Sequence, residues 1–213
     1  MLHQSEEEQV EALKKWWQAN ASAIITGLVL GVAVIVGWQW WTGNRTQHAE
    51  QASLHYDALS VALATDNAAE ARRHGQTLVD DYDDTPYAVL AALGLARLAA
   101  DGGDNAAAIR HLEWVEAHAG QPPVQDIARL RLARLLLAEG RLDDAAGKLD
   151  KVQGGGFTAE LEELKGDIYL ARNQPDKARE SWRIAQLAAG PEGGSPLLAL
   201  KLDNLPPAAG QEN

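Results

Sequence analysis

The pattern of hydrophobic and polar positions divides the chain into an apolar N-terminal segment and a longer amphipathic part. No charged residue occurs between Lys15 and Arg45, and residues 21–38 are apolar apart from two hydroxyl side chains. With its tryptophan flanks this run reaches about 20 residues, which at about 1.5 Å per residue crosses the hydrocarbon core of a bilayer. The pattern predicts a transmembrane helix over residues 20–41, preceded by a tail at residues 1–19.

Tryptophans mark both ends of the predicted span. Two precede it and three follow it, at Trp16, Trp17, Trp38, Trp40 and Trp41. Such aromatic belts lie at membrane interfaces. The alternative is a cleaved signal peptide, which has a shorter apolar region followed by a small-residue cleavage site. The long run, its tryptophan-rich exit and the acidic tail before it favour an uncleaved signal anchor.

The charges beside the span predict its orientation. Lys14 and Lys15 lie directly before it, and Arg45 is the nearest basic residue behind it. Basic residues collect on the cytoplasmic side of a membrane. We therefore expect a cytoplasmic N-terminus and a C-terminal domain on the opposite side of the membrane.

A face of small residues runs along the predicted span. Ala23, Gly27 and Gly31 are spaced four apart, so they share one helix face. Small residues at this spacing let a neighbouring membrane helix approach closely. The alternative is that glycine is simply common in membrane helices. The pattern indicates a packing face at these three residues.

Behind the span, the segments have apolar residues at spacings of three and four, as in helices. Prolines suited to first helical turns occur at Pro86, Pro122 and Pro175, and breaks fall at residues 101–104, 139–141 and 154–156. This predicts an all-α domain of about eight helices of roughly 12–20 residues, with a short further helix near residues 195–202.

The amphipathic part also repeats. Alanines at Ala108, Ala145 and Ala178 fall 37 and 33 residues apart, close to the 34-residue period of tetratricopeptide repeats. Three small residues precede them at positions where paired helices would touch, and three large ones follow that would fill the space towards the next repeat: Ala96, Ala133 and Gly166, then Leu112, Leu149 and Trp182. A weaker fourth copy spans residues 52–82, with Ala71 at the alanine position. We predict a tetratricopeptide-like solenoid over residues 42–204 and a flexible tail at residues 205–213.

Composition narrows the chemistry. The net charge is −11, which disfavours nucleic acid as a partner. The absence of cysteine excludes disulfides and thiolate metal sites. The chain contains no catalytic or phosphate-binding motif, and its six histidines are scattered. We therefore expect no catalytic residue, no cofactor and no metal. An unrecognised hydrolase site in a groove is the alternative from the enzyme class.

A helical-repeat array offers a concave groove lined by the first helix of each repeat. The register of the repeats points six side chains towards it: Leu93, Arg97, Leu130, Arg134, Glu163 and Asp167. We expect the leucines to contact apolar side chains of a bound peptide and the arginines to hold carboxylates. The alternative is that the arginines are solvated and the leucines are buried between helices.

The N-terminus carries the most specific resemblance to a known family. Residues 9–17 (QVEALKKWW), Asn20, the glycine-spaced span and its Gly-Trp-x-Trp exit resemble the YfgM-type proteins, as do residues 130–134 and the Gly166-Asp167 pair. These proteins are tetratricopeptide-like ancillary subunits of the bacterial Sec translocon. The resemblance implies an inner-membrane protein with a periplasmic repeat domain. It also implies partners: the SecYEG translocon, the periplasmic chaperone PpiD and exported polypeptides.

These observations together predict a membrane-anchored interaction scaffold and not an enzyme. Within that architecture two alternatives stay open. One is service to another envelope assembly, such as cytochrome or cell-wall biogenesis. The other is that the anchor mediates self-association and the repeats are mainly structural.

Overall fold

The computed structural model describes residues 2–193 and 196–205, and within these ranges the regular elements are all helices. The chain divides into two compact units, Met1–Gln51 and Ala52–Asn213. The long first helix, α1 (Leu2–Ala64), contributes to both of them. The predicted all-α fold class is confirmed.

In the first unit, α1 contains a segment that is long and apolar enough to cross a membrane by length and composition, and none of its most apolar 18-residue window is buried. Polar side chains at the two ends fold back onto the helix. Asn20 donates from Nδ2 to the Trp16 carbonyl at 2.8 Å, and Thr42 donates from Oγ1 to the Trp38 carbonyl at 2.9 Å. The Arg45 guanidinium lies over the Trp41 ring, 5.1 Å from its centroid. Both ends of the apolar segment therefore combine aromatic rings with satisfied polar groups, as suits a membrane interface.

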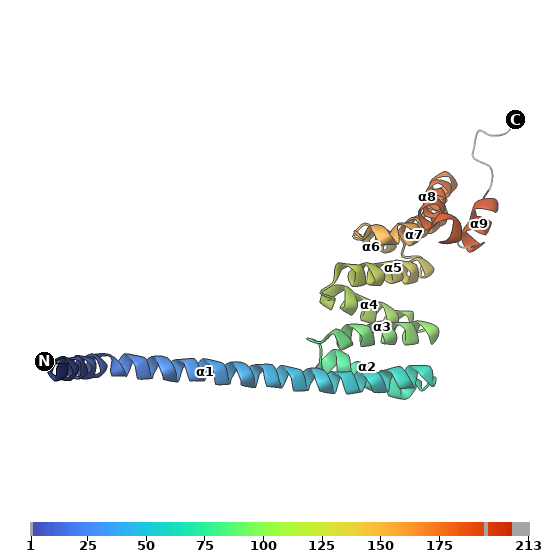
Figure 1. The fold of residues 1–213 in the computed structure, drawn as a ribbon. Helices are drawn as coiled ribbons and strands as arrows, with labels where there is room; N and C mark the ends of the chain where they lie inside the picture. The colour runs from blue at the N-terminus through green and yellow to red at the C-terminus, as the bar shows by residue number, and fades with distance from the viewer. Residues whose placement is uncertain (1, 194–195, 206–213) are drawn as a thin grey trace. The chain divides into compact units, whose positions relative to one another are not determined.

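The second unit is a stack of helices joined by short turns (Figure 1). After α1, the elements are α2 (Ala68–Asp81), α3 (Pro86–Asp101), α4 (Asn105–His118), α5 (Pro122–Ala138), α6 (Leu142–Leu149), the short 3₁₀ helix η1 (Gly155–Phe157), α7 (Thr158–Ala171), α8 (Pro175–Gly193) and α9 (Pro196–Asp203). Prolines open α3, α5 and α8, as predicted from their fit to a first helical turn. The short helix expected near residues 195–202 is α9.

Four equivalent turns define four helix pairs. Each turn contains a residue with positive φ, at Asp66, Gly103, Gly140 and Asn173, and successive positions differ by 37, 37 and 33. Glycine adopts this conformation without the steric cost that other residues meet. The pairs are the end of α1 with α2, α3 with α4, α5 with α6, and α7 with α8. The weak fourth repeat over residues 52–82 is thus confirmed, and its Ala71 is fully buried.

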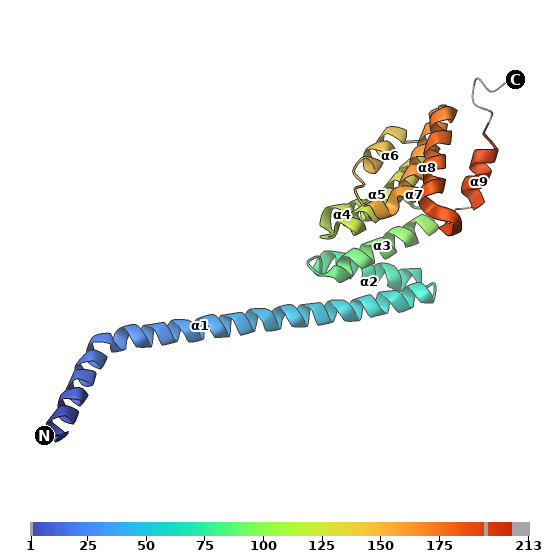
Figure 2. The same cartoon turned by 45° about the horizontal axis from the view of Figure 1, so that its top comes forward.

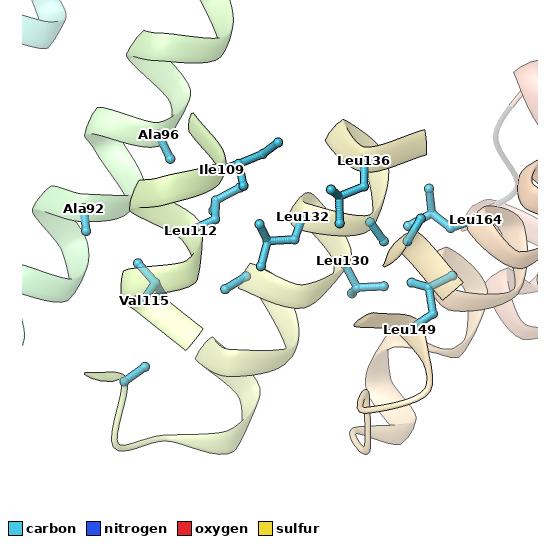
Figure 3. Close-up of a cluster of buried hydrophobic side chains, with 14 of the residues drawn as sticks. Ala92, Ala96, Ile109, Leu112, Val115, Leu130, Leu132, Leu136, Leu149 and Leu164 are labelled. Carbon is cyan, nitrogen blue, oxygen red and sulfur yellow. The ribbon is translucent and has the colours of Figure 1, made fainter. Parts of the chain in front are cut away.

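The predicted repeat positions form the core. The alanines Ala108, Ala145 and Ala178 have no exposed surface, and Leu112, Leu149 and Trp182 are at most 2% exposed. Each helix from α2 onward packs against the next one along the chain, as Figures 1 and 2 show. Buried side chains from α3 to α7 form one continuous apolar layer (Figure 3). The core is therefore a chain of interfaces between neighbours, as expected of a solenoid.

The last repeat has the tightest helix contact. A Cβ atom added at Gly166 would lie 2.3 Å from atoms of the Trp182 indole, so α7 and α8 meet there without room for any side chain. The indole Nε1 donates to the Glu163 carbonyl at 3.1 Å and to Asp167 Oδ1 at 3.1 Å. Gly166 is therefore required by the bulk of Trp182.

A buried ion-pair network ties the glycine-rich loop before α7 to α5. Asp126, 1% exposed, accepts hydrogen bonds from Arg129 Nη1 at 2.9 Å and from the Gly154 N–H at 2.9 Å. Arg129 and Lys148 both donate to Glu116, at 3.1 and 2.6 Å. Burial alone would raise the pKa of Glu116, but the hydrogen bonds from Lys148 and Arg129 outweigh it and hold the pKa below its ordinary value.

Candidate functional site

An open cavity of about 390 Å³ lies between α3, α4 and α5. It is lined by three arginines and four apolar residues: Ala96, Arg97, Ala100, Leu112, Arg131, Arg134 and Leu135. Because α3 and α5 are the first helices of successive repeats, the cavity belongs to the surface on which the sequence predicted a groove. We call it the arginine cavity.

The rim of the arginine cavity is cationic, and its internal ion pairs are exposed. Arg97 lies 3.5 Å from Asp101, and these side chains are 83% and 69% exposed. Arg134 lies 2.8 Å from Glu160, with exposures of 57% and 39%. Arg131 is exposed and forms no ion pair within the described part of the chain. Exposed ion pairs contribute about 0–1 kcal/mol, so an incoming carboxylate could replace them at little cost.

The floor of the arginine cavity is apolar. Ala96 and Leu112 are 3% and 2% exposed, and Leu135 is half-buried on the wall. Figure 3 shows Ala96 and Leu112 among the buried side chains of α3 and α4. An apolar floor beneath guanidinium groups can hold an apolar side chain and a carboxylate at the same time.

The two predicted leucines lie in different surroundings from the arginines. Leu93 is half-buried and packs against the core, while Leu130 is 1% exposed and belongs to the core itself. The turn of α5 that contains Leu130 is covered because α5 packs against α4, α6 and α7. Leu130 therefore has no surface to offer a peptide, and we do not retain it in the proposed groove. Arg134, one turn further along, reaches solvent.

The predicted acidic residues meet a cation from this chain. Lys201 of α9 places its Nζ 2.8 Å from Glu163 Oε1 and 2.8 Å from each Asp167 carboxylate oxygen. Burial alone would lower the pKa of Lys201, but the hydrogen bonds to Asp167 and Glu163 outweigh it and raise the pKa above its ordinary value. Leu198 of the same helix is 2% exposed beside Trp182. The six predicted residues thus include two separate pairs: Arg97 with Arg134, and Glu163 with Asp167.

Sequence reasoning missed Arg131 and a histidine pair. Arg131 precedes Arg134 by three residues, so helical spacing alone places both on one face of α5. The Nδ1 atoms of His55 on α1 and His74 on α2 lie 3.1 Å apart. Burial, with Arg73 and His55 nearby, lowers the pKa of His74. Only the folded chain brings these two rings together.

The small-residue face of the apolar segment is open. Ala23 is exposed, and a Cβ added at Gly27 or Gly31 would meet no atom within 4 Å beyond the adjacent residues and the nearby backbone of α1 itself. The face is therefore available to another helix. That it packs against one stays a prediction.

Comparison with known proteins gives the same architecture over nearly the full chain. A family defined as a tetratricopeptide repeat-like domain matches residues 14–207. The "Ancillary SecYEG translocon subunit" of Haemophilus influenzae is 32% identical over 200 residues, covering 94% of this chain and 97% of that protein. The proteins of the same name from Aggregatibacter actinomycetemcomitans and Escherichia coli are 30% and 26% identical, and the alignments cover 94% and 96% of this chain and 97% and 98% of those proteins.

Proposed function

The chain belongs to the family of ancillary SecYEG translocon subunits with a tetratricopeptide repeat-like domain, and from this premise we propose that it is a membrane-anchored scaffold serving the translocon during protein export. The observation that carries the proposal is the extent of the similarity. It includes most of the apolar helix as well as the four repeats, whereas a shared repeat alone would indicate only the fold.

The proposed topology places residues 20–41 across the bacterial inner membrane. The N-terminal tail lies in the cytoplasm and the repeat domain in the periplasm. The charge bias of Lys14 and Lys15 against Arg45 supports this orientation. The aromatic residues and back-bonded polar side chains at both ends of the apolar segment support the span.

The proposed partners are the SecYEG channel, the periplasmic chaperone PpiD and exported polypeptides. The names of the relatives support the first of them. The resemblance of the sequence to YfgM-type proteins supports the other two. The face formed by Ala23, Gly27 and Gly31 is suited to a membrane helix of such a partner.

The mechanism is binding under confinement. A single span holds the repeat domain beside the membrane, so its surface meets emerging chains and membrane partners at a high effective concentration. The first helices of the repeats present exposed charged side chains, among them Arg97 and Arg134. No bond needs to be made or broken for such a protein to act.

The test is crosslinking in cells followed by purification in mild detergent, with the full chain and with a chain lacking residues 1–43. A third version replaces residues 1–43 by an unrelated single span of the same topology. We expect the full chain to recover translocon subunits and the unanchored chain to lose most of them. If the version with the unrelated span recovers fewer translocon subunits than the full chain but more than the unanchored chain, part of the contact is made by residues 1–43 themselves.

The opposite result is equally clear. Recovery of a different envelope complex by the full chain, without translocon subunits, would overturn the proposed function. It would leave the anchored repeat architecture in place.

A further inference from the structure

We propose that the arginine cavity binds an extended segment of a partner protein in which carboxylates flank an apolar side chain. This inference rests on the proposed function, because it specifies the chemistry by which the scaffold would recognise a protein beside the membrane. It concerns the surface formed by α3, α4 and α5 alone.

Charge is the first argument. The chain has a net charge of −11, yet three arginines converge on one opening. Arg97 and Arg134 have only exposed carboxylate partners, and Arg131 has no ion pair within the described residues. Guanidinium groups bind carboxylates through two parallel hydrogen bonds. An anionic ligand would therefore gain strong contacts while displacing weak ones.

Shape is the second argument. The cavity volume of about 390 Å³ suits one or two side chains above the apolar floor of Ala96 and Leu112. The arginines stand on two first helices, Arg97 on α3 and Arg131 and Arg134 on α5. A segment that crosses from one helix to the other would meet cations on both sides of its central residue. In an extended chain, side chains two positions apart point to the same face, so an apolar residue with an acidic residue two positions before it and another two positions after it satisfies this geometry.

The third argument is that the acidic pair, Glu163 and Asp167, already has a cationic partner in this chain. The groove predicted from the sequence carried both signs of charge, and a basic peptide would have suited Glu163 and Asp167. Lys201 already occupies both carboxylates at 2.8 Å, and α9 covers them with Leu198 buried beside it. The first helices therefore offer an accessible cationic cavity and an acidic pair that the chain itself neutralises. This selects an acidic ligand over a basic one.

The test measures binding of a fluorescein-labelled peptide, Gly-Ser-Glu-Ser-Leu-Ser-Glu-Ser-Gly, to the full chain in nanodiscs of zwitterionic lipid. Fluorescence anisotropy gives the affinity, and empty nanodiscs give the background. We expect saturable binding that weakens as salt is raised. A peptide with glutamine in place of each glutamate should bind at least about tenfold more weakly, since it lacks charge-assisted hydrogen bonds.

Matched variants locate the site. The double variant Arg131→Gln, Arg134→Gln should bind the acidic peptide at least about tenfold more weakly, because both guanidinium groups are removed from the rim of the cavity. Arg110→Gln with Arg183→Gln removes the same charge from exposed positions outside the cavity and should change affinity by less than about twofold. Ala100→Trp fills the cavity without changing charge and should also abolish binding, whereas Ala188→Trp on an exposed surface should not. Circular dichroism verifies that each variant is folded.

Three results would overturn the inference: equal binding of the neutral peptide, an equal loss in the Arg110 and Arg183 variant, or no binding at millimolar peptide. These measurements need no translocon. A chain that binds the peptide but recovers no translocon subunits would overturn the proposed function alone. A chain that recovers the translocon but ignores the peptide would overturn this site alone.

Discussion

Two neighbouring repeats fill equivalent helix–helix interfaces with different residues. In the α5–α6 repeat the tight position is Ala133 and the large position is Leu149, and both are 1% exposed. In the α7–α8 repeat the same positions hold Gly166 and Trp182, and the indole lies where a Cβ of residue 166 would be. The larger side chain is accommodated by removing the opposing one. The comparison indicates that a larger side chain at one position of the interface goes with a smaller residue at the other.

The exchange also changes what the end of the solenoid can bind. Unlike leucine, tryptophan carries an N–H that needs an acceptor when buried. Trp182 donates to the Asp167 carboxylate, and that carboxylate in turn binds Lys201 of α9. The last repeat is thus closed by its own C-terminal helix. The middle repeats keep an open cavity with an arginine rim.

The largest expected effect is that of Trp182→Ala, which removes the large side chain from the α7–α8 interface. Loss of a fully buried indole should lower the free energy of unfolding by about 3–5 kcal/mol. Hydrogen exchange of the full chain in detergent should show the loss in α7, α8 and α9, with α3 and α4 much less affected, because each repeat contacts only its neighbours. Ile184→Ala, at a partly exposed site on the same helix, is the control. Uniform loss of protection across all helices would contradict the local character of the interface.

The middle repeats should be most sensitive at Asp126. Asp126→Ala removes one of the two carboxylates that pair with Arg129 and leaves the Gly154 N–H without its buried acceptor, and we expect a cost of about 2–3 kcal/mol. Urea unfolding of the full chain measures this loss of stability, and amide hydrogen exchange should become faster at residues 153–157. Asp126→Asn keeps an acceptor oxygen and should cost less. If alanine and asparagine were equally destabilising, the charge and not the loop contact would be the important feature.

The volume argument itself is tested at Gly166. Gly166→Ala forces a methyl group against the indole and should cost about 1–3 kcal/mol. Trp182→Leu leaves a cavity when made alone. Together the two substitutions recreate the Ala–Leu combination of the α5–α6 repeat, so the double variant should be more stable than the sum of the single effects predicts. Strict additivity in a double-mutant cycle would show that the two positions do not compensate.

The smallest expected effect is pH dependence centred on Glu116. Its folded pKa lies below the ordinary value of 4.5, so it stabilises the fold above that pH, and this contribution is lost as pH falls from 4.5 through the folded pKa. Between pH 6 and 3, the free energy of unfolding should therefore decline less steeply for Glu116→Gln than for the unmodified chain. An identical slope in the two proteins would remove Glu116 from the set of groups linked to folding. Glu139→Gln, at an exposed glutamate, is the matched control.

Local patterns determined the architecture. The uncharged run between Lys15 and Arg45 identified the apolar segment because membrane spanning depends on length and hydrophobicity alone. The recurrence of Ala108, Ala145 and Ala178 identified the repeat because each repeat packs mainly on the one beside it. From the sequence alone, Ala133 and Gly166 could be recognised as equivalent positions at which paired helices touch. The boundary predicted between residues 41 and 42 falls inside a single helix, since α1 extends from Leu2 to Ala64.

The surface was decided by tertiary structure. The register of the repeats placed Arg97, Arg134 and Leu130 on one surface. Arg97 and Arg134 line one cavity, but the packing of α5 buries Leu130. It assigned Glu163 and Asp167 to a partner, although Lys201, more than 30 residues away, pairs with both. Helical periodicity fixes which residues share a face of one helix. Which part of that face is covered, and by which distant side chain, depends on how the helices dock against one another, and that information is spread over the whole chain.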